Sequence, residues 1–333
     1  MHPFIPHPLL TNPHLMTLFP RYWPRPSLLR RVPLEERLFQ VDVHSRILAR
    51  CHWHPRRNRH PALVLVHGLE GCTESHYMRG IAHKAWHAGF HVVRMNQRNC
   101  GGTEQLTPTL YNGGLSDDVR AVVVELYQRD GIEAIGVAGY SMGGNLVLKM
   151  AGEAEDRLPG LLGVATVCPN IDPAACVAAL QEPRNWIYHR HFLLKLKARL
   201  RRKARLFPGK FDLTRLATIK TLEEFDETYT APDGGYRNAQ DYYDRSGARH
   251  VIGRITVPTL IITSQDDQFV PFRTFEIASV QTNPAIQFVG TEAGGHCGFI
   301  QRPCQVEDLY WAENRIVEFF QRLWEKQGIP SRS

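Results

Sequence analysis

Short apolar runs alternate with segments of helical spacing along most of this chain, and no other feature limits its fold as strongly. The apolar runs are predicted as buried strands at residues 62–68, 90–96, 134–139, 161–168, 256–264 and 285–291. The predicted helices are residues 77–89, 115–129 with Ser116 as N-cap, 143–153, 272–279 and 306–326. Strands that are apolar on both faces and alternate with helices are typical of a parallel sheet covered on both sides. We therefore predict an α/β fold with a mostly parallel central sheet flanked by helices.

The alternation stops after Pro169 and resumes near residue 250. Residues 171–250 are charged and aromatic, with helical pieces and no regular strand rhythm. This pattern indicates a helical cap or lid inserted into the α/β unit. No internal repeat or flexible linker divides the chain, so we predict one domain over residues 1–333. The proline-rich residues 1–35 are expected to form an extended segment that packs on this domain.

The composition is that of a globular protein, with 333 residues of which 43% are hydrophobic and 22% charged. No apolar run approaches the roughly 18–20 residues of a transmembrane helix, and the N-terminal prolines interrupt the apolar core that a signal peptide requires. The seven cysteines are scattered without a Cys-x-x-Cys pair, which argues against a disulfide framework and against a zinc site. We expect an unexported cytoplasmic protein with reduced thiols, without a metal or an organic cofactor.

The net charge is +7, and much of the basic excess lies in residues 189–210. This stretch is interpreted either as a solvated basic helix face or as a patch that attracts anionic membrane lipid or an acidic substrate. No nucleic-acid-binding motif accompanies the charge, so nucleic acid is not an expected partner. The sequence carries no signal for an oligomeric state.

Residues 137–145 read VAGYSMGGN and place Ser141 between two glycines, directly after an apolar run. A Gly-x-Ser-x-Gly motif also occurs in ordinary turns, so its meaning depends on the rest of the chain. A nucleophilic serine needs a histidine to accept its proton and an acid to hold that histidine. It also needs backbone amides that bind the oxyanion.

Two aspartates follow the predicted strand at residues 256–264. A loop at the carboxyl end of a strand is where an α/β sheet carries its chemistry. Asp267 is favoured as the acid because it stands four residues before Pro271, with Asp266 as the runner-up and Asp172 as a weaker third choice. The other member of the pair is expected to cap a turn.

His296 is the candidate base, in the glycine-rich stretch TEAGGHCGFI after the last predicted strand. A lone histidine among sixteen carries little information, and this one is distinguished by its position. His83 and His87 stand four apart on one predicted helix. They are interpreted as surface histidines, because no acidic ligand or third partner accompanies them.

The loop HGLEG at residues 67–71 follows the first long apolar run and is the candidate for half of an oxyanion hole. The expected donors are the backbone N–H groups of Leu69 and of Met142, the residue after the serine. Each such donor is typically worth roughly 3 kcal/mol in the transition state. The Met142 side chain should then tolerate substitution better than its neighbours do, because only its amide takes part.

With these parts in order, the chain resembles the α/β-hydrolases, and within them the YheT-like branch, which also holds membrane-anchored mammalian relatives and yeast medium-chain ester synthases. The resemblance covers nearly the whole chain and rests on NPHLMTLFP, HGLEG, NQRNCGG, LYNGGLSDDVR, GYSMGGN, EEFDETYTAP with DYYDRSG, and GGHCGF. The block in the expected cap is more specific than the serine motif. In two respects the chain departs from the branch: the N-terminal anchor of the mammalian relatives is not expected, and Gln268 stands where proline is frequent.

The resemblance implies a carboxylesterase of lipid metabolism that cleaves short- to medium-chain acyl esters through Ser141, Asp267 and His296 and an acyl-enzyme. An alcohol O-acyltransferase or a thioesterase with the same triad is the alternative, with a lactonase also open. A non-catalytic binding protein on a hydrolase fold is a remote alternative. Five aromatic residues of the expected cap either line an acyl pocket or form core: Trp186, Tyr188, Phe192, Phe207 and Phe211.

Overall fold

An eight-stranded sheet organises the computed structural model, which describes residues 2–23, 25, 29–154 and 158–327. The strands follow the order β1-β2-β4-β3-β5-β6-β7-β8 across the sheet. Their bounds are β1 Glu35–Asp42, β2 Ser45–His52, β3 Ala62–Val66, β4 His91–Met95, β5 Ile135–Tyr140, β6 Leu161–Val167, β7 Thr259–Ser264 and β8 Ile286–Thr291. All neighbours among β3 to β8 pair in parallel. The predicted fold class is thereby confirmed.

β1 and β2 form an antiparallel hairpin at one edge of the sheet, which the sequence prediction did not include. Along β1 the side chains alternate between partly buried and exposed, and Phe39 is the one fully buried residue of the strand. A strand with one solvated face contains too few apolar residues to give a continuous run. β2 pairs antiparallel with β4, so the hairpin extends the parallel sheet.

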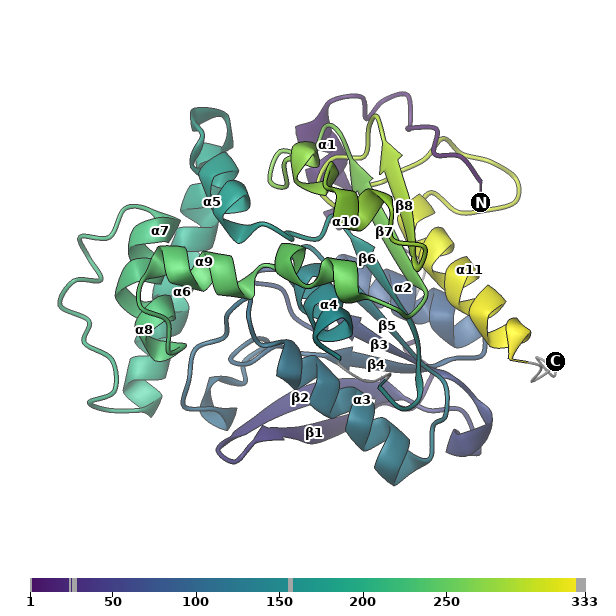
Figure 1. Cartoon of the computed structure of the whole chain (residues 1–333), viewed down its shortest axis with the longest axis horizontal. Helices are drawn as coiled ribbons and strands as arrows, with labels where there is room; N and C mark the ends of the chain where they lie inside the picture. The colour runs from purple at the N-terminus through teal and green to yellow at the C-terminus, as the bar shows by residue number, and fades with distance from the viewer. Residues whose placement is uncertain (1, 24, 26–28, 155–157, 328–333) are drawn as a thin grey trace.

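Helices cover both faces of the sheet, as Figure 1 shows, with α2 and α11 on one face and α3 and α4 on the other. Their bounds are α2 His76–His87, α3 Ser116–Asp130, α4 Met142–Glu153 and α11 Trp311–Lys326. The strands divide their side chains between the faces, so that in β3 Leu63 lies with α2 and α11 and Val64 lies with α3 and α4. No helix in the described ranges is long and apolar enough to cross a bilayer.

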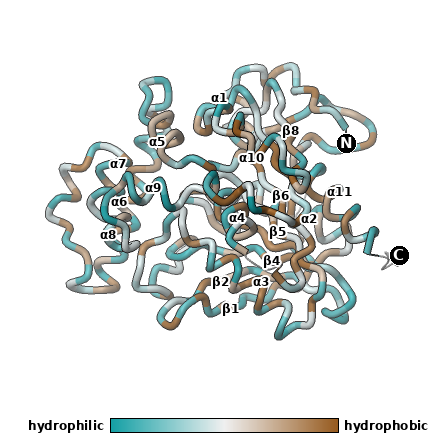
Figure 2. Tube along the Cα trace, in the orientation of Figure 1, coloured by the Kyte–Doolittle hydropathy of each residue, from teal (hydrophilic) through white to brown (hydrophobic). Residues whose placement is uncertain are grey.

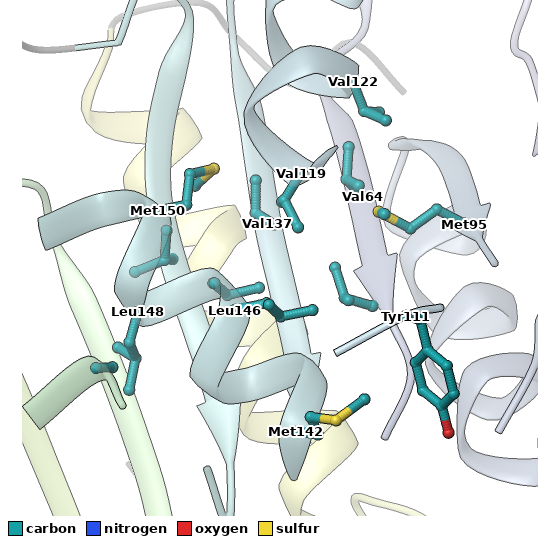
Figure 3. Close-up of a cluster of buried hydrophobic side chains, with 14 of the residues drawn as sticks. Val64, Met95, Tyr111, Val119, Val122, Val137, Met142, Leu146, Leu148 and Met150 are labelled. Carbon is teal, nitrogen blue, oxygen red and sulfur yellow. The ribbon is translucent and has the colours of Figure 1, made fainter. Parts of the chain in front are cut away.

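α4 lies at the centre of one of these layers, and its residues 142–152 are all buried. Figure 3 shows Met142, Leu146 and Met150 of α4 packed beside Val137 of β5 and Val119 of α3. A helix that is buried all round cannot shift without disturbing its neighbours, because protein interiors are close-packed. Hydrophobic segments gather along the central strands in Figure 2. The residue that precedes α4, Ser141, is therefore held by the core.

Five helices lie between β6 and β7 in the chain and gather at one side of the sheet in Figure 1; we call them the cap helices. They are α5 Pro173–Gln181, α6 Trp186–Leu206, α7 Leu222–Phe225, α8 Ala231–Asp233 and α9 Ala239–Ser246. Asn145 of α4 is fully buried, and its side chain donates to the Gly113 and Ser246 carbonyls at 2.9 Å. It also accepts from the Ala248 N–H at 2.8 Å, so one side chain anchors the end of α9 to the helix behind Ser141.

The N-terminal segment packs against the loop that contains Gly298 and Ile300. The His7 N–H donates to the Ile300 carbonyl at 3.0 Å, and helix α1, Pro13–Leu18, contacts the loop that precedes Ile300. Gly298 leaves no room for a Cβ against the Met16 carbonyl, so glycine permits this close approach. Of the predicted segment 1–35, residues 1, 24 and 26–28 lie outside the described residues.

Two predicted helices differ in detail. Ser116 is the first residue of α3 and not its N-cap, and its hydroxyl donates to the Glu153 carboxylate at 2.6 Å. Residues 272–279 do not form one helix but a 3₁₀ turn at Phe272–Phe275, followed by the short α10, Ala278–Gln281.

Candidate active site

Ser141 lies on a sharp turn between β5 and α4. Its backbone has φ 53° and ψ −120°, a left-handed conformation that L-residues rarely adopt and that stores strain. Gly143 makes this turn possible, because a Cβ there would collide with the carbonyls of Val66 and His67 on β3 and its loop. The turn thus presents the serine at the carboxyl end of the sheet, in the manner of a nucleophile elbow.

His296 and Asp267 form a buried, hydrogen-bonded pair. The His296 Nδ1–H donates to Asp267 Oδ2 at 2.8 Å, with Oδ1 at 3.1 Å. The Asp267 side chain is fully buried, and its Oδ1 also accepts from the N–H groups of Phe269 and Val270 at 2.8 and 3.0 Å. These bonds fix the carboxylate and leave Nε2 of His296 free to act as a base.

The other two candidate acids have structural partners. Asp266 accepts from the Gly295 N–H at 2.8 Å and so shapes the loop that carries His296. Asp172 is the N-cap of α5, accepts from the Ala175 N–H at 3.2 Å and pairs with Arg249. The geometry therefore favours Asp267 among the three.

Ser141 and His296 line one cavity of about 210 Å³, together with Leu69, Met142 and Phe192. No hydrogen bond joins Ser141 to His296 in the part of the chain that the structure describes. Such contacts are often long without substrate and tighten in the Michaelis complex. His83 and His87 lie elsewhere, on α2, and no third metal-binding side chain joins them among the described residues.

The N–H groups of Leu69 and Met142 both belong to residues that line this cavity. Neither amide donates a hydrogen bond within the described ranges, although both neighbours of Leu69 do: Gly68 donates to Tyr77 at 3.0 Å and Glu70 to Tyr111 at 3.2 Å. Two unused amides at the serine, one at a helix N-terminus, are suited to bind an anion.

Asp267 changes the protonation of His296. Burial by itself lowers the pKa of the imidazole, but the charge and the hydrogen bond of Asp267 outweigh burial and raise the pKa of His296 well above its ordinary value. His67, in the neighbouring loop, has no hydrogen bond to a carboxylate among the described residues. Burial lowers the pKa of His67 to about 4, and its Nε2 accepts from the Gln97 N–H at 3.0 Å. His67 is thus a neutral support for the loop.

Thr17 of α1 contacts His296, the candidate base, and the sequence prediction did not include this contact. Its hydroxyl accepts from the backbone N–H of His296 at 2.8 Å and lies 3.0 Å from the side-chain oxygen of Gln268. Gln268 follows Asp267 directly, so one hydroxyl joins the loops that carry Asp267 and His296. The motif NPHLMTLFP that contains Thr17 was the available signal, although it gave no role for this residue.

A second unpredicted contact joins the cap to the loop of Leu69. Arg199 of α6 donates from Nε and Nη2 to the two carboxylate oxygens of Glu70, at 3.0 and 2.8 Å. The two side chains are only 7% and 4% exposed. The interpretation of residues 189–210 as a solvated face is therefore wrong for Arg199, and also for Lys203, which is fully buried against the Glu104 carbonyl.

Of the cap aromatics, Phe192 lines the cavity, and Tyr188 packs edge-on against Phe269, another lining residue, with ring centroids 4.7 Å apart. Three others do not line it: Trp186, Phe207 and Phe211. Phe211 instead lines a separate cavity of about 400 Å³ within the cap region.

Comparison with known proteins identifies sequence relatives of this chain. The YheT protein of Escherichia coli, named as a candidate esterase, is 31% identical over 98% of this chain and 95% of its own. The yeast medium-chain fatty acid ethyl ester synthase/esterase 2 is 28% identical over 92% of this chain and 68% of its own. Phospholipase ABHD3 of the mouse is 29% identical over 72% of this chain, which covers 59% of that protein.

The fold is also that of solved hydrolases. An esterase of Pyrococcus furiosus, Pf2001, superposes with a TM-score of 0.57 at 16% identity, over 88% of this chain and 93% of its own. The 2,6-dihydroxy-pseudo-oxynicotine hydrolase gives a TM-score of 0.61 at 19% identity, over 90% of this chain and 70% of its own. The family model for the alpha/beta hydrolase fold matches residues 61–303. The chain therefore belongs to the α/β-hydrolase family, in the branch of YheT.

Proposed function

We propose that this chain is a serine carboxylesterase with Ser141 as the nucleophile, His296 as the base and Asp267 as the acid. The observation that carries the proposal is one cavity lined by a strained serine, a carboxylate-bound histidine and two residues with unused amides. An esterase- or lipase-like hydrolase is also the class that membership of the family supports. The cap helices act in this proposal as a lid over the acyl site.

In the proposed mechanism His296 takes the proton of Ser141 as its oxygen attacks the ester carbonyl. The amides of Leu69 and Met142 bind the oxyanion that forms, while Asp267 stabilises the imidazolium. His296 then gives its proton to the leaving alcohol. A water molecule, deprotonated by His296, releases the carboxylic acid from the acyl-enzyme.

The size of the cavity supports short to medium acyl chains. Its volume of about 210 Å³ exceeds the roughly 150 Å³ that encloses a benzene molecule, and it is below the roughly 300–1,000 Å³ of pockets for drug-sized ligands. Phe192, Phe269 and Leu180 give it an apolar wall. A long acyl chain would require the cap to move.

Turnover of p-nitrophenyl esters from acetate to palmitate tests the proposal. We expect the highest kcat/KM at short to medium chains and a loss of at least about 10³-fold in Ser141→Ala, which also should not react with a fluorophosphonate. Met142→Leu is the matched control, because it changes the neighbouring side chain but keeps the amide. Equal rates of Ser141→Ala and the unchanged protein would exclude the serine mechanism.

Acyl transfer to an alcohol is the second candidate, supported by the yeast relative that is named for both synthase and esterase activity. The chemistry differs only in whether water or an alcohol attacks the acyl-enzyme. Adding ethanol to the assay separates the two, because a transferase yields mainly ethyl ester whereas a hydrolase still yields mainly acid.

We also propose that the cap meets anionic membranes through an exposed face of α6. Trp186, Ile187 and Leu194 are 56%, 64% and 55% exposed, and Arg190 lies on the same face. α6 contains no acidic residue. A helix face that combines a tryptophan, aliphatic side chains and cations is suited to the interface of an anionic bilayer.

Sedimentation with phosphatidylcholine vesicles, with and without phosphatidylserine, tests this contact. We expect binding only with phosphatidylserine, its loss at high salt, and its weakening in Leu194→Glu. Val306→Glu is the control, because Val306 is exposed but lies outside α6. Equal binding of both variants would exclude the contact. We further propose that the protein meets the membrane from the cytoplasm. All seven cysteines of the described chain are unpaired, and thiols persist in reducing compartments.

A further inference from the structure

Two cysteines lie against the candidate base, and neither takes part in the proposed mechanism. A ring nitrogen of His296 and the Sγ atoms of Cys168 and Cys297 all lie within 4.8 Å of one another. Cys168 follows β6 directly and is fully buried, whereas Cys297 is partly exposed and lines the cavity of Ser141. Cys168 and Cys297 are far apart in the sequence, so no motif of closely spaced ligands predicts this cluster.

The backbone turns both thiols toward this point. Cys168 and Cys297 have φ values of 46° and 62°, a left-handed conformation that costs energy for a residue with a side chain. The Cys297 N–H donates to Cys168 Sγ at 3.4 Å, which joins the end of β6 to the loop of the base. The Cys297 Sγ in turn lies 3.6 Å from the Val167 carbonyl of β6.

Sulfur and imidazole nitrogen are the ligands that a borderline-soft divalent ion such as Zn²⁺ prefers. Zinc binds thiolates at about 2.3 Å, which sets two sulfurs of a tetrahedral site about 3.8 Å apart. Because zinc binds nitrogen at about 2.0–2.1 Å, the sulfurs need to approach each other by at most about 1 Å and the nitrogen by at most about 1.3 Å. Asp267 already holds His296 by hydrogen bonding, as carboxylates hold metal-bound histidines in zinc enzymes.

We propose that Cys168, Cys297 and His296 form a site for a thiophilic divalent cation of the Zn²⁺ class, and that its binding inhibits the enzyme. Binding converts two thiols to thiolates and releases their two protons to solvent. The ion uses the imidazole lone pair that would otherwise accept the serine proton. The fourth position faces the cavity lined by His296 and Cys297, where a water molecule completes the shell. The inhibition rests on the proposed function, whereas the metal site does not.

Equilibrium dialysis with Zn²⁺, in the presence of a phosphine reductant that keeps the thiols reduced, tests the site directly. We expect one ion per chain, released by EDTA, and at least tenfold weaker binding in Cys168→Ser and in Cys297→Ser. Co²⁺ as a second probe should give a thiolate-to-cobalt absorption band that both variants weaken. Cys304→Ser is the matched control, because Cys304 is exposed and outside the cluster.

Activity with and without Zn²⁺ is then compared within each variant, so that changes in basal rate cancel. We expect inhibition in proportion to occupancy in the unchanged protein and in Cys304→Ser, with loss of inhibition in the other two variants. Ser141→Ala should still bind Zn²⁺, so the site stands even if the esterase proposal fails. Absence of Zn²⁺ binding in an active enzyme, or binding that survives both Cys168→Ser and Cys297→Ser, would overturn the inference.

Discussion

Replacing Arg199 by methionine should weaken the fold and the candidate oxyanion loop together. Methionine retains much of the buried volume, but it leaves the Glu70 carboxylate, which is 4% exposed, without its cation. Breaking a buried pair by removing one partner costs about 3–5 kcal/mol. The Tyr111 hydroxyl still donates to Glu70 at 2.7 Å, so we expect the lower end of this range, about 3 kcal/mol.

This loss is large enough to measure as a change in Tm. At about 2.1 cal/mol/K per residue, the unfolding entropy of 333 residues is about 0.7 kcal/mol/K, and 3 kcal/mol lowers Tm by about 4 °C. We also expect kcat to fall by about tenfold, because Glu70 adjoins Leu69 and one complete oxyanion donor is worth roughly 10²–10³. Calorimetry and p-nitrophenyl ester kinetics give the two values.

Arg201→Met is the control on the same helix. Arg201 is exposed and has no ion pair among the described residues, so its replacement should cost less than about 1 kcal/mol. The double variant Glu70→Gln/Arg199→Met removes both charges and should regain part of the stability lost in the single variant. The reasoning is refuted if Arg199→Met and Arg201→Met lower Tm equally and leave kcat unchanged.

Four further outcomes follow from the same structure. Asp267→Asn should lower kcat by about 10⁴-fold, whereas Asp266→Asn should remain within about tenfold of the unchanged enzyme; the reverse result would exchange the two roles. Because His296 must be neutral to accept a proton and Asp267 raises its pKa, kcat/KM should rise with pH, with a midpoint above the ordinary 6.5 that Asp267→Asn moves down. Thr17→Val should lower kcat about tenfold and Thr17→Ser should restore it, because only the hydroxyl holds the His296 amide; a similar rate in both variants would contradict this. Asn145→Ala removes three buried hydrogen bonds and should cost about 3 kcal/mol in urea unfolding, and a loss below 1 kcal/mol would contradict that estimate.

The sequence predicts the central strands well because each is buried on both faces and reads as a continuous apolar run. The sequence does not reveal β1 and β2, because a strand with one solvent-exposed face contains only isolated buried apolar residues such as Phe39. The start of α3 is also misplaced, because Ser116 bonds across to Glu153 and not to its own helix. A local rule for capping cannot anticipate a partner on another helix.

In the candidate site, too, the sequence predicts the residues that have a local signal and misses those that depend on distant partners. Ser141, Asp267 and His296 each follow a predicted strand, and parallel strands bring their carboxyl ends to one edge, so local signals suffice to select them. Thr17 and Arg199 act through partners 279 and 129 positions away. Their contacts depend on how α1 and α6 pack on the sheet, which no motif in the sequence encodes.

The bond between Thr17 and the His296 amide has a consequence for the order in which the protein is made. α1 leaves the ribosome before its partner loop, which follows 279 residues later. At about 5–20 residues per second, the N-terminal helix waits roughly 15–55 s for the surface on which it packs. Its apolar side chains, Met16 above all, are exposed throughout that interval. A nascent chain of this protein should therefore depend on chaperones during that interval and become active only after the loop of His296 has emerged.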